Sequence, residues 1–181
     1  MTTEAEFAER RTRLLGPMEG MSDGEVKRDV RESFSKLASV IDSLSDEQAT
    51  WKPDLQEWSA AQVGDHIALS TGMLGSIAGL LAKGQAVTDA DWDPPPQFKG
   101  NAADLGNVKR RLEELPPYAD KLFEEGSSTD RLDVKANNSF LGDMNWREWF
   151  YFLRIHAQAH IDQIEKLRAT RGFPGSESGD R

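Results

Sequence analysis

The chain contains no cysteine among its 181 residues. This excludes disulfide bonds, thiolate metal ligands and a cysteine nucleophile, and it is consistent with a reducing compartment. Basic residues are also few, because 22 lysines and arginines stand against 31 aspartates and glutamates, which gives a formal net charge of −9. A protein this acidic repels phosphate backbones, so we expect no nucleic-acid partner.

Long hydrophobic runs are missing as well. The most apolar window, residues 73–82, is too short to span a bilayer and is interrupted by Gly75 and Gly79. Residues 1–13 are charged and lack the apolar segment of a signal peptide. We therefore expect a cytoplasmic protein with no membrane contact. The 38% of hydrophobic residues is enough for a folded core.

What the sequence does have is helical periodicity. Capping boxes begin at Ser22 and Ser59, and Asn101 and Asn145 begin two further segments, each with an acidic residue three positions on. Apolar residues then recur every three or four positions, so each segment carries one apolar stripe. The stripes consist of Val26, Val30, Phe34, Leu37, Ile41 and Leu44; Val63, Ile67, Ser70, Leu74, Ile77 and Leu81; Leu105, Val108, Leu112, Leu115, Ala119 and Leu122; and Trp149, Leu153, His156, His160, Gln163 and Leu167.

Four such helices bury their stripes best against one another, which predicts an all-α protein with a four-helix bundle over residues 22–172. Residues 1–21 are expected to form an N-terminal extension with a lead-in helix over 4–15. Residues 173–181 are expected to form a flexible tail.

The third helix and the two long connections carry further expectations. Pro116 and Pro117 predict a kink or break within the third helix. Residues 84–100 and 127–142 are expected to be loops without a convincing strand, with at most a short extended piece at 131–136. Connections this long allow a helix order other than simple up-down-up-down.

Three histidines, the only ones in the chain, give the strongest functional signal. His156 and His160 are spaced like neighbours on one helix face, about 5–6 Å apart at Cβ. His66 lies at the edge of the inward stripe of the second helix. Three neutral imidazoles from two helices fill three corners of a tetrahedron around a divalent ion and leave the fourth for water or substrate. A buried histidine is also often only a hydrogen-bonded core residue, and spacing does not decide between the two.

Two other metal motifs are excluded by neighbouring residues. The zinc-protease helix H-E-x-x-H needs a glutamate where Ala157 stands. A di-iron bundle needs Glu-x-x-His pairs, and the residues three before the histidines are Val63, Leu153 and Ala157.

Three stretches in a fixed order carry a family resemblance. They are E-W-S at 57–59 followed by G-D-H-I at 64–67, F-L-G-D-M-N-W-R-E-W at 140–149, and H-A-Q-A-H-I-D-Q-I at 156–164. Together they resemble the DinB-like superfamily, a group of metal-dependent proteins that includes thiol-dependent S-transferases and maleylpyruvate isomerases. The chain departs from the pattern at 138–139, where Asn-Ser replaces the His-Pro that is common in relatives.

The resemblance implies an antiparallel four-helix bundle, often a homodimer. It also implies a divalent metal ion, zinc or nickel, on His66, His156 and His160.

Two further residues are candidates for catalysis. Gln163 lies three positions after His160, where it would hold a metal-bound water or the second nitrogen of a ligand, or else bridge two helices. Asp65 precedes His66 and is a candidate base or hydrogen-bond acceptor, although a solvated carboxylate is the interpretation that its position favours. Trp92, in the proline-rich loop, fits either a lid over the site or a contact with a partner.

The leading hypothesis is a metal-dependent enzyme with a small-molecule substrate. The ion would lower the pKa of a bound water or thiol, a step that hydrolysis and thiol transfer share. No clear general base lies near the histidines, which favours transfer of a low-molecular-weight thiol. The alternatives are a metal-binding bundle without turnover and a helical interaction module.

Overall fold

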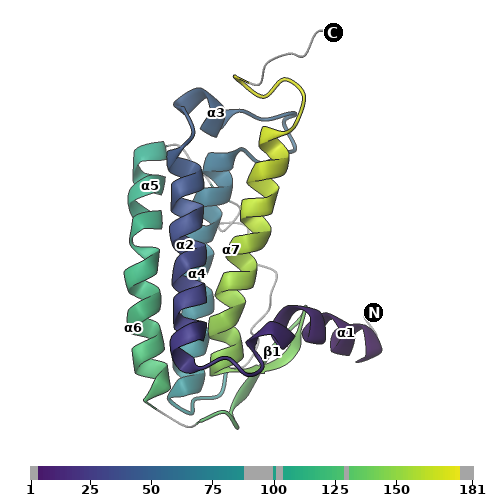
Figure 1. The fold of residues 1–181 in the computed structure, drawn as a ribbon, viewed down its shortest axis with the longest axis vertical. Coiled ribbons are helices and arrows are strands. Elements are labelled where there is room, and N and C mark those ends of the chain that lie inside the picture. The colour runs from purple at the N-terminus through teal and green to yellow at the C-terminus, as the bar shows by residue number, and fades with distance from the viewer. Residues whose placement is uncertain (1–3, 88–99, 101–103, 129–130, 176–181) are drawn as a thin grey trace.

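The computed structural model describes the chain except residues 1–3, 88–99, 101–103, 129–130 and 176–181, and helices make up most of it (Figure 1). The elements are α1 (Glu4–Leu15), a short 3-10 turn η1 (Gly16–Met18), α2 (Asp23–Asp42), α3 (Asp46–Thr50), α4 (Ala60–Ala82), α5 (Leu105–Glu113), α6 (Leu115–Ser127), β1 (Lys135–Asn138), β2 (Gly142–Asn145) and α7 (Trp146–Arg168). Within the described ranges, no helix is both long and apolar enough to cross a membrane.

Three of the four predicted helix starts are confirmed. Ser22, Ser59 and Asn145 are the N-caps of α2, α4 and α7, and each forms a complete capping box with the residue three positions on. Another capping box, at Ser45, opens the short helix α3. The apolar pattern did not reveal α3, because a helix this short shows no periodicity.

The third helix begins later than predicted. Asp104 is the N-cap of α5, and its carboxylate accepts a hydrogen bond from the N–H of Asn107. The expected cap, Asn101, lies outside the described residues. The predicted break is confirmed, because α5 and α6 are separate helices. Pro116 and Pro117 lie in the first turn of α6, where a missing N–H costs no hydrogen bond.

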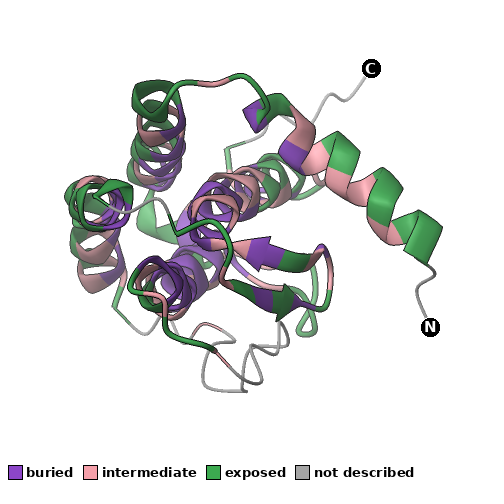
Figure 2. Cartoon of the chain, turned by 90° about the horizontal axis from the view of Figure 1, so that it is seen from below, coloured by how far each residue is buried: buried purple, intermediate pink, exposed green. Residues whose placement is uncertain are grey.

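The predicted apolar stripes meet in one core, which Figure 2 shows as the buried residues that face the centre of the bundle. Every predicted stripe residue is buried except Leu105, His160 and Gln163, which are half-buried. The four-helix bundle is therefore confirmed, and the hydrophobic effect drives its assembly from the stripes identified in the sequence.

Contacts between helices fix their directions. Helices α2 and α6 are antiparallel, because their ion pairs run in opposite order along the two helices: Lys27 with Glu124 and Arg31 with Asp120. Helices α2 and α7 are parallel, because their ion pairs run in the same order: Asp23 with Arg147 and Asp29 with Arg154. Helix α4 is parallel to the third helix, because Gly64 faces Val108 and Gly75 faces Tyr118. The order is therefore up-down-down-up, a departure from simple alternation that the two long connections permit.

A small hairpin before α7 is the main departure from the predicted secondary structure. Strands β1 and β2 pair antiparallel, with Ala136 opposite Met144, within and just after the segment that was expected to be a loop over 127–142. The short extended piece was expected at 131–136 and lies later in the chain. Four-residue strands with mostly polar side chains show no clear alternation, so the sequence pattern does not separate them from a loop.

The turn of the hairpin explains why it forms. The side chain of Asn138 accepts hydrogen bonds from the N–H groups of Phe140 and Leu141, at 2.9 and 3.0 Å. Gly142 has a φ of +73°, a conformation that favours glycine. The Asn-Ser pair that departs from the family pattern thus supplies the side chain that shapes this turn.

The helix predicted over residues 4–15 is present as α1, and it extends away from the bundle beside the hairpin (Figure 2). Arg10 donates a hydrogen bond to the carbonyl oxygen of Phe140 at 2.8 Å. Arg11 donates to the carbonyl oxygens of Leu141 and Asp143 and pairs with Glu148 of α7. Hydrogen bonds from two arginines of α1 therefore hold the hairpin turn against this helix.

Near the other end of the chain, Phe173 is buried and packs on Trp51 with ring centroids 5.5 Å apart. The packed core therefore extends to Phe173, one residue beyond the predicted end of the bundle. The domain limits at residues 21 and 172 stay a prediction.

Candidate metal site

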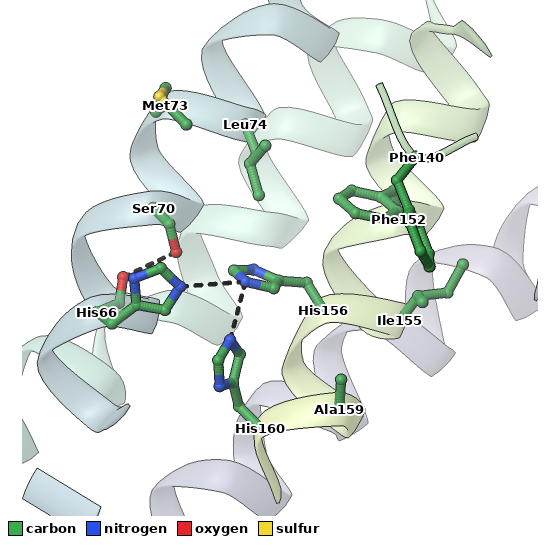
Figure 3. A pocket seen from close by; sticks show the side chains of 10 residues that line it. All are labelled: His66, Ser70, Met73, Leu74, Phe140, Phe152, Ile155, His156, Ala159 and His160. Carbon is green, nitrogen blue, oxygen red and sulfur yellow. Dashed lines mark hydrogen bonds between the residues drawn. The ribbon is translucent and has the colours of Figure 1, made fainter. Parts of the chain in front are cut away.

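The three histidine rings meet between α4 and α7, as Figure 3 shows. Nε2 of His156 lies 3.3 Å from Nε2 of His66 and 3.1 Å from Nε2 of His160. His66 and His156 are buried, and His160 is half-buried. The convergence that the helical spacing suggested is therefore present in the fold.

Hydrogen bonds among the rings do not account for this arrangement. A neutral imidazole nitrogen carries one proton or offers one in-plane lone pair, so it makes one good hydrogen bond. Nε2 of His156 faces two other ring nitrogens, and Nε2 of His160 has no proton to donate, because its Nδ1 donates to Gln163, so at most one of the two contacts is a good hydrogen bond. A cation that accepts a lone pair from each ring removes the conflict.

The donor set and its spacing fit a divalent metal ion. In a tetrahedral site with metal–nitrogen distances of about 2.0–2.1 Å, neighbouring nitrogens lie about 3.3 Å apart. The two Nε2 separations of 3.1 and 3.3 Å are close to this value. Imidazole nitrogens suit zinc and nickel among the divalent ions.

Burial keeps two of the rings in the neutral form that binds metal. It lowers the pKa of His156 well below the usual 6.5, and the nearby rings of His160 and His66 lower it further. Burial also lowers the pKa of His160 to about 4, against the opposing effect of a hydrogen bond to Gln163. Both rings are therefore uncharged at neutral pH, so a metal ion would displace no proton from them.

Gln163 orients one of the rings. Its Oε1 lies 2.8 Å from Nδ1 of His160, so Nδ1 donates the hydrogen bond and the lone pair is on Nε2, which faces His156. Of the roles considered for Gln163, this contact matches the one in which it holds the second nitrogen of a ligand. A direct part in catalysis stays a prediction.

Asp65 is buried and paired, so its interpretation as a solvated carboxylate is wrong. Its Oδ1 accepts a hydrogen bond from Arg111 of α5 at 2.6 Å. The pairing is possible because α5 lies close against α4, where a Cβ added at Gly64 would be 2.9 Å from the side chain of Val108. The local sequence around Asp65 carries no sign of a partner 46 positions away. A catalytic role for Asp65 stays a prediction.

The Asp65→Asn substitution separates a structural role from a role at the metal site. We expect it to lower the free energy of unfolding by about 1–3 kcal/mol, because it weakens a largely buried ion pair with Arg111. The metal content should stay at the wild-type level. Urea unfolding and elemental analysis measure the two quantities, and Asp162→Asn, at an exposed carboxylate of α7, is the matched control. Loss of metal without loss of stability would instead place Asp65 at the site.

A partly open pocket of about 290 Å³ lies beside the rings (Figure 3). The three histidines form part of its wall, so an ion held by them would be reached from the pocket. The other described lining residues are Ser70, Met73, Leu74, Phe140, Phe152, Ile155 and Ala159.

Sequence reasoning missed the aromatic residues around the rings. Phe152 precedes His156 by one helical turn and stacks on it at an interplanar angle of 6°, so the four-residue spacing could have revealed it. Trp58 comes directly before Ser59, the N-cap of α4, and its ring centroid lies 5.2 Å from that of His66. Phe140 comes from the hairpin turn, and no local pattern points to it. Trp92 lies outside the described residues.

The fold and the site together define a four-helix bundle with three converging histidines beside a pocket. The chain belongs to the DinB superfamily, whose family model matches residues 28–164. A solved structure of similar fold is that of YfiT from Bacillus subtilis, described as "a probable metal-dependent hydrolase with an unusual four-helix bundle topology". The two share 19% sequence identity with a TM-score of 0.63 over 83% of this chain and 90% of that one, a likeness in fold. No match was found among curated proteins.

Proposed function

We propose that the protein is a metal-dependent enzyme that holds one divalent ion, zinc or nickel, with His66, His156 and His160 and acts on a small molecule. One observation carries the proposal: three ring nitrogens converge in the wall of a pocket at separations close to those of ligands around one tetrahedral ion. Membership of the DinB superfamily and the fold shared with YfiT support it. The expected homodimer and cytoplasmic location remain predictions.

When bound, a divalent ion supplies Lewis acidity, which lowers the pKa of a water or thiol at the site and yields a nucleophile near neutral pH. The chain's own residues control the protonation of the rings and the surroundings of the site. Burial keeps His156 and His160 uncharged, Gln163 fixes which nitrogen of His160 carries the lone pair, and the apolar wall limits the access of water.

Two reactions of this class have different support. The described residues that line the pocket include no carboxylate, and Asp65 is paired with Arg111, so neither offers an evident base for water. This favours transfer of a low-molecular-weight thiol, because a coordinated thiolate is itself the nucleophile. The likeness to YfiT, described as a probable hydrolase, favours hydrolysis as the second candidate.

A paired assay on zinc-loaded and nickel-loaded protein tests the proposal. Conjugation of cysteine to 1-chloro-2,4-dinitrobenzene reports thiol transfer, and release of nitrophenol from 4-nitrophenyl acetate reports hydrolysis. We expect turnover in the first assay that disappears in the metal-stripped protein and in the His66→Ala variant, and that persists in Asp162→Asn. Equal turnover with and without metal would contradict the proposal. A loaded protein that turns over neither substrate would favour the metal-binding bundle without catalysis.

A further inference from the structure

The pocket beside the histidines differs in chemistry from the surface of the protein. Charged residues make up 29% of the chain, yet none of the described residues that line this pocket is an aspartate, glutamate, lysine or arginine. Apart from the three rings and Ser70, whose hydroxyl donates to the carbonyl oxygen of His66, the described lining is apolar. A charged group placed there would lose water without gaining a partner from these residues.

A second pocket provides a contrast within the same chain. It has a volume of about 440 Å³, shares Ala159 with the pocket beside the rings, and has Asp54, Glu57 and Lys166 in its lining. Polar and charged groups therefore find partners a short way along α7. The apolar character of the pocket beside the rings is a property of that place and not of the whole bundle.

The apolar walls are held in place before any molecule binds. Leu74 and Phe152 are 1% and 2% exposed and are part of the bundle core. Phe140, from the hairpin turn, is held by Arg10, whose guanidinium carbon lies 4.3 Å from the centre of the phenyl ring and which also donates to its carbonyl oxygen. A preformed pocket loses less conformational entropy when it binds a ligand.

From these observations we infer that the substrate of the proposed metal site carries an uncharged apolar group, an alkyl chain or an aryl ring. This group occupies the pocket between Met73, Leu74, Phe140, Phe152 and Ile155, while the polar end of the substrate faces the histidines. The inference rests on the proposed function, because it assigns the substrate class of that same site. Small, fully polar molecules are disfavoured, since they leave the apolar walls uncovered.

Linear alkyl hydroxamic acids provide the test, because the head group binds zinc and the tail length varies freely. Isothermal titration of zinc-loaded protein with acetohydroxamic, butyrohydroxamic and hexanohydroxamic acid should show tighter binding with each methylene, about fourfold where it is fully buried. Over the four methylenes of the series we expect a gain on the order of 100-fold. The metal-stripped protein should bind all three weakly.

Matched variants on α4 locate the tail. Met73→Glu places a carboxylate in the pocket, and it should reduce the ratio of hexanohydroxamate to acetohydroxamate affinity at least tenfold, since burying the tail against a charge is unfavourable. Ser76→Glu adds the same charge at an exposed position of the same helix, outside the lining of this pocket, and should leave the ratio unchanged. Ala159→Phe, at an exposed lining position, fills the pocket without a new charge and should also reduce the ratio if Met73→Glu does not fold.

The outcomes separate this inference from the proposed function. If acetohydroxamate binds only the zinc-loaded protein but longer tails bind no tighter, the metal site stands and the apolar pocket does not hold the tail. If the chain-length effect persists in both Met73→Glu and Ala159→Phe, the tail lies elsewhere and the inference is overturned. If the protein holds neither zinc nor nickel, the proposed function itself is wrong.

Discussion

Replacement of His156 by alanine is expected to abolish the binding of zinc or nickel to the untagged protein, whereas the wild type should hold one ion per chain. His156 is the central ring, because its Nε2 is the nitrogen that lies within 3.3 Å of both others. Without it, His66 and His160 offer two ligands from different helices, and a tetrahedral site with three protein ligands is lost. Elemental analysis after metal exposure and dialysis measures the difference.

Thermal unfolding gives a second readout of the same variant. Metal at a thousandfold excess over its Kd stabilises the folded state by about 4 kcal/mol, which corresponds to a rise in Tm of about 10 °C for a chain of this size. We expect this rise in the wild type and in Gln158→Ala, a control on the same helix, and no rise in His156→Ala. If variant and wild type carry the same trace of metal, the protein is a helical interaction module and not a metalloprotein.

The metal-free protein is expected to lose stability as the pH falls from about 6.5 towards 4. The pKa of His160 is about 4 in the folded state and near the ordinary 6.5 in the unfolded chain, so the unfolded state takes up the proton more readily. The stabilising contribution is complete above pH 6.5 and declines as the pH approaches 4. For His160 this amounts to about 3 kcal/mol, and the lowered pKa of His156 acts in the same direction.

Comparison with His160→Gln isolates this effect from the titration of carboxylates, which also destabilises acidified proteins. Urea unfolding of the stripped proteins at several values between pH 7 and 4.5 should give a steeper decline for the wild type than for the variant. Parallel declines would contradict the assigned cause. Loading with zinc should steepen the wild-type curve further, because protons then compete with the ion for the rings.

The parts of the fold that the sequence predicted depend on local physics. Helix starts at Ser22, Ser59 and Asn145 follow from side chains that cap backbone groups three residues away. The pairing of His156 with His160 follows from the pitch of one helix. His66 comes close to the other two rings only if the apolar stripes of α4 and α7 face each other. This arrangement could be expected, because both stripes must be buried.

The parts that the sequence did not predict depend on contacts between distant segments. Asp65 meets Arg111 only because α4 and α5 lie side by side, and Phe140 reaches the pocket only because a hairpin turn places it there. The parallel course of α4 and α5 also has no local cause. These features depend on how the connections between helices cross the ends of the bundle. The spacing of apolar residues along one helix contains no information about the path of a connection.

The attachment of α1 has a consequence for chains of different length. Arg10 steadies Phe140, so residues 4–15 contribute to the shape of a cavity that they do not line. A truncated chain that starts at α2 would retain all three histidines and yet have a looser opening beside them. In a homologue that kept the bundle but lacked the leading helix, the same three histidines would stand beside a pocket of different shape.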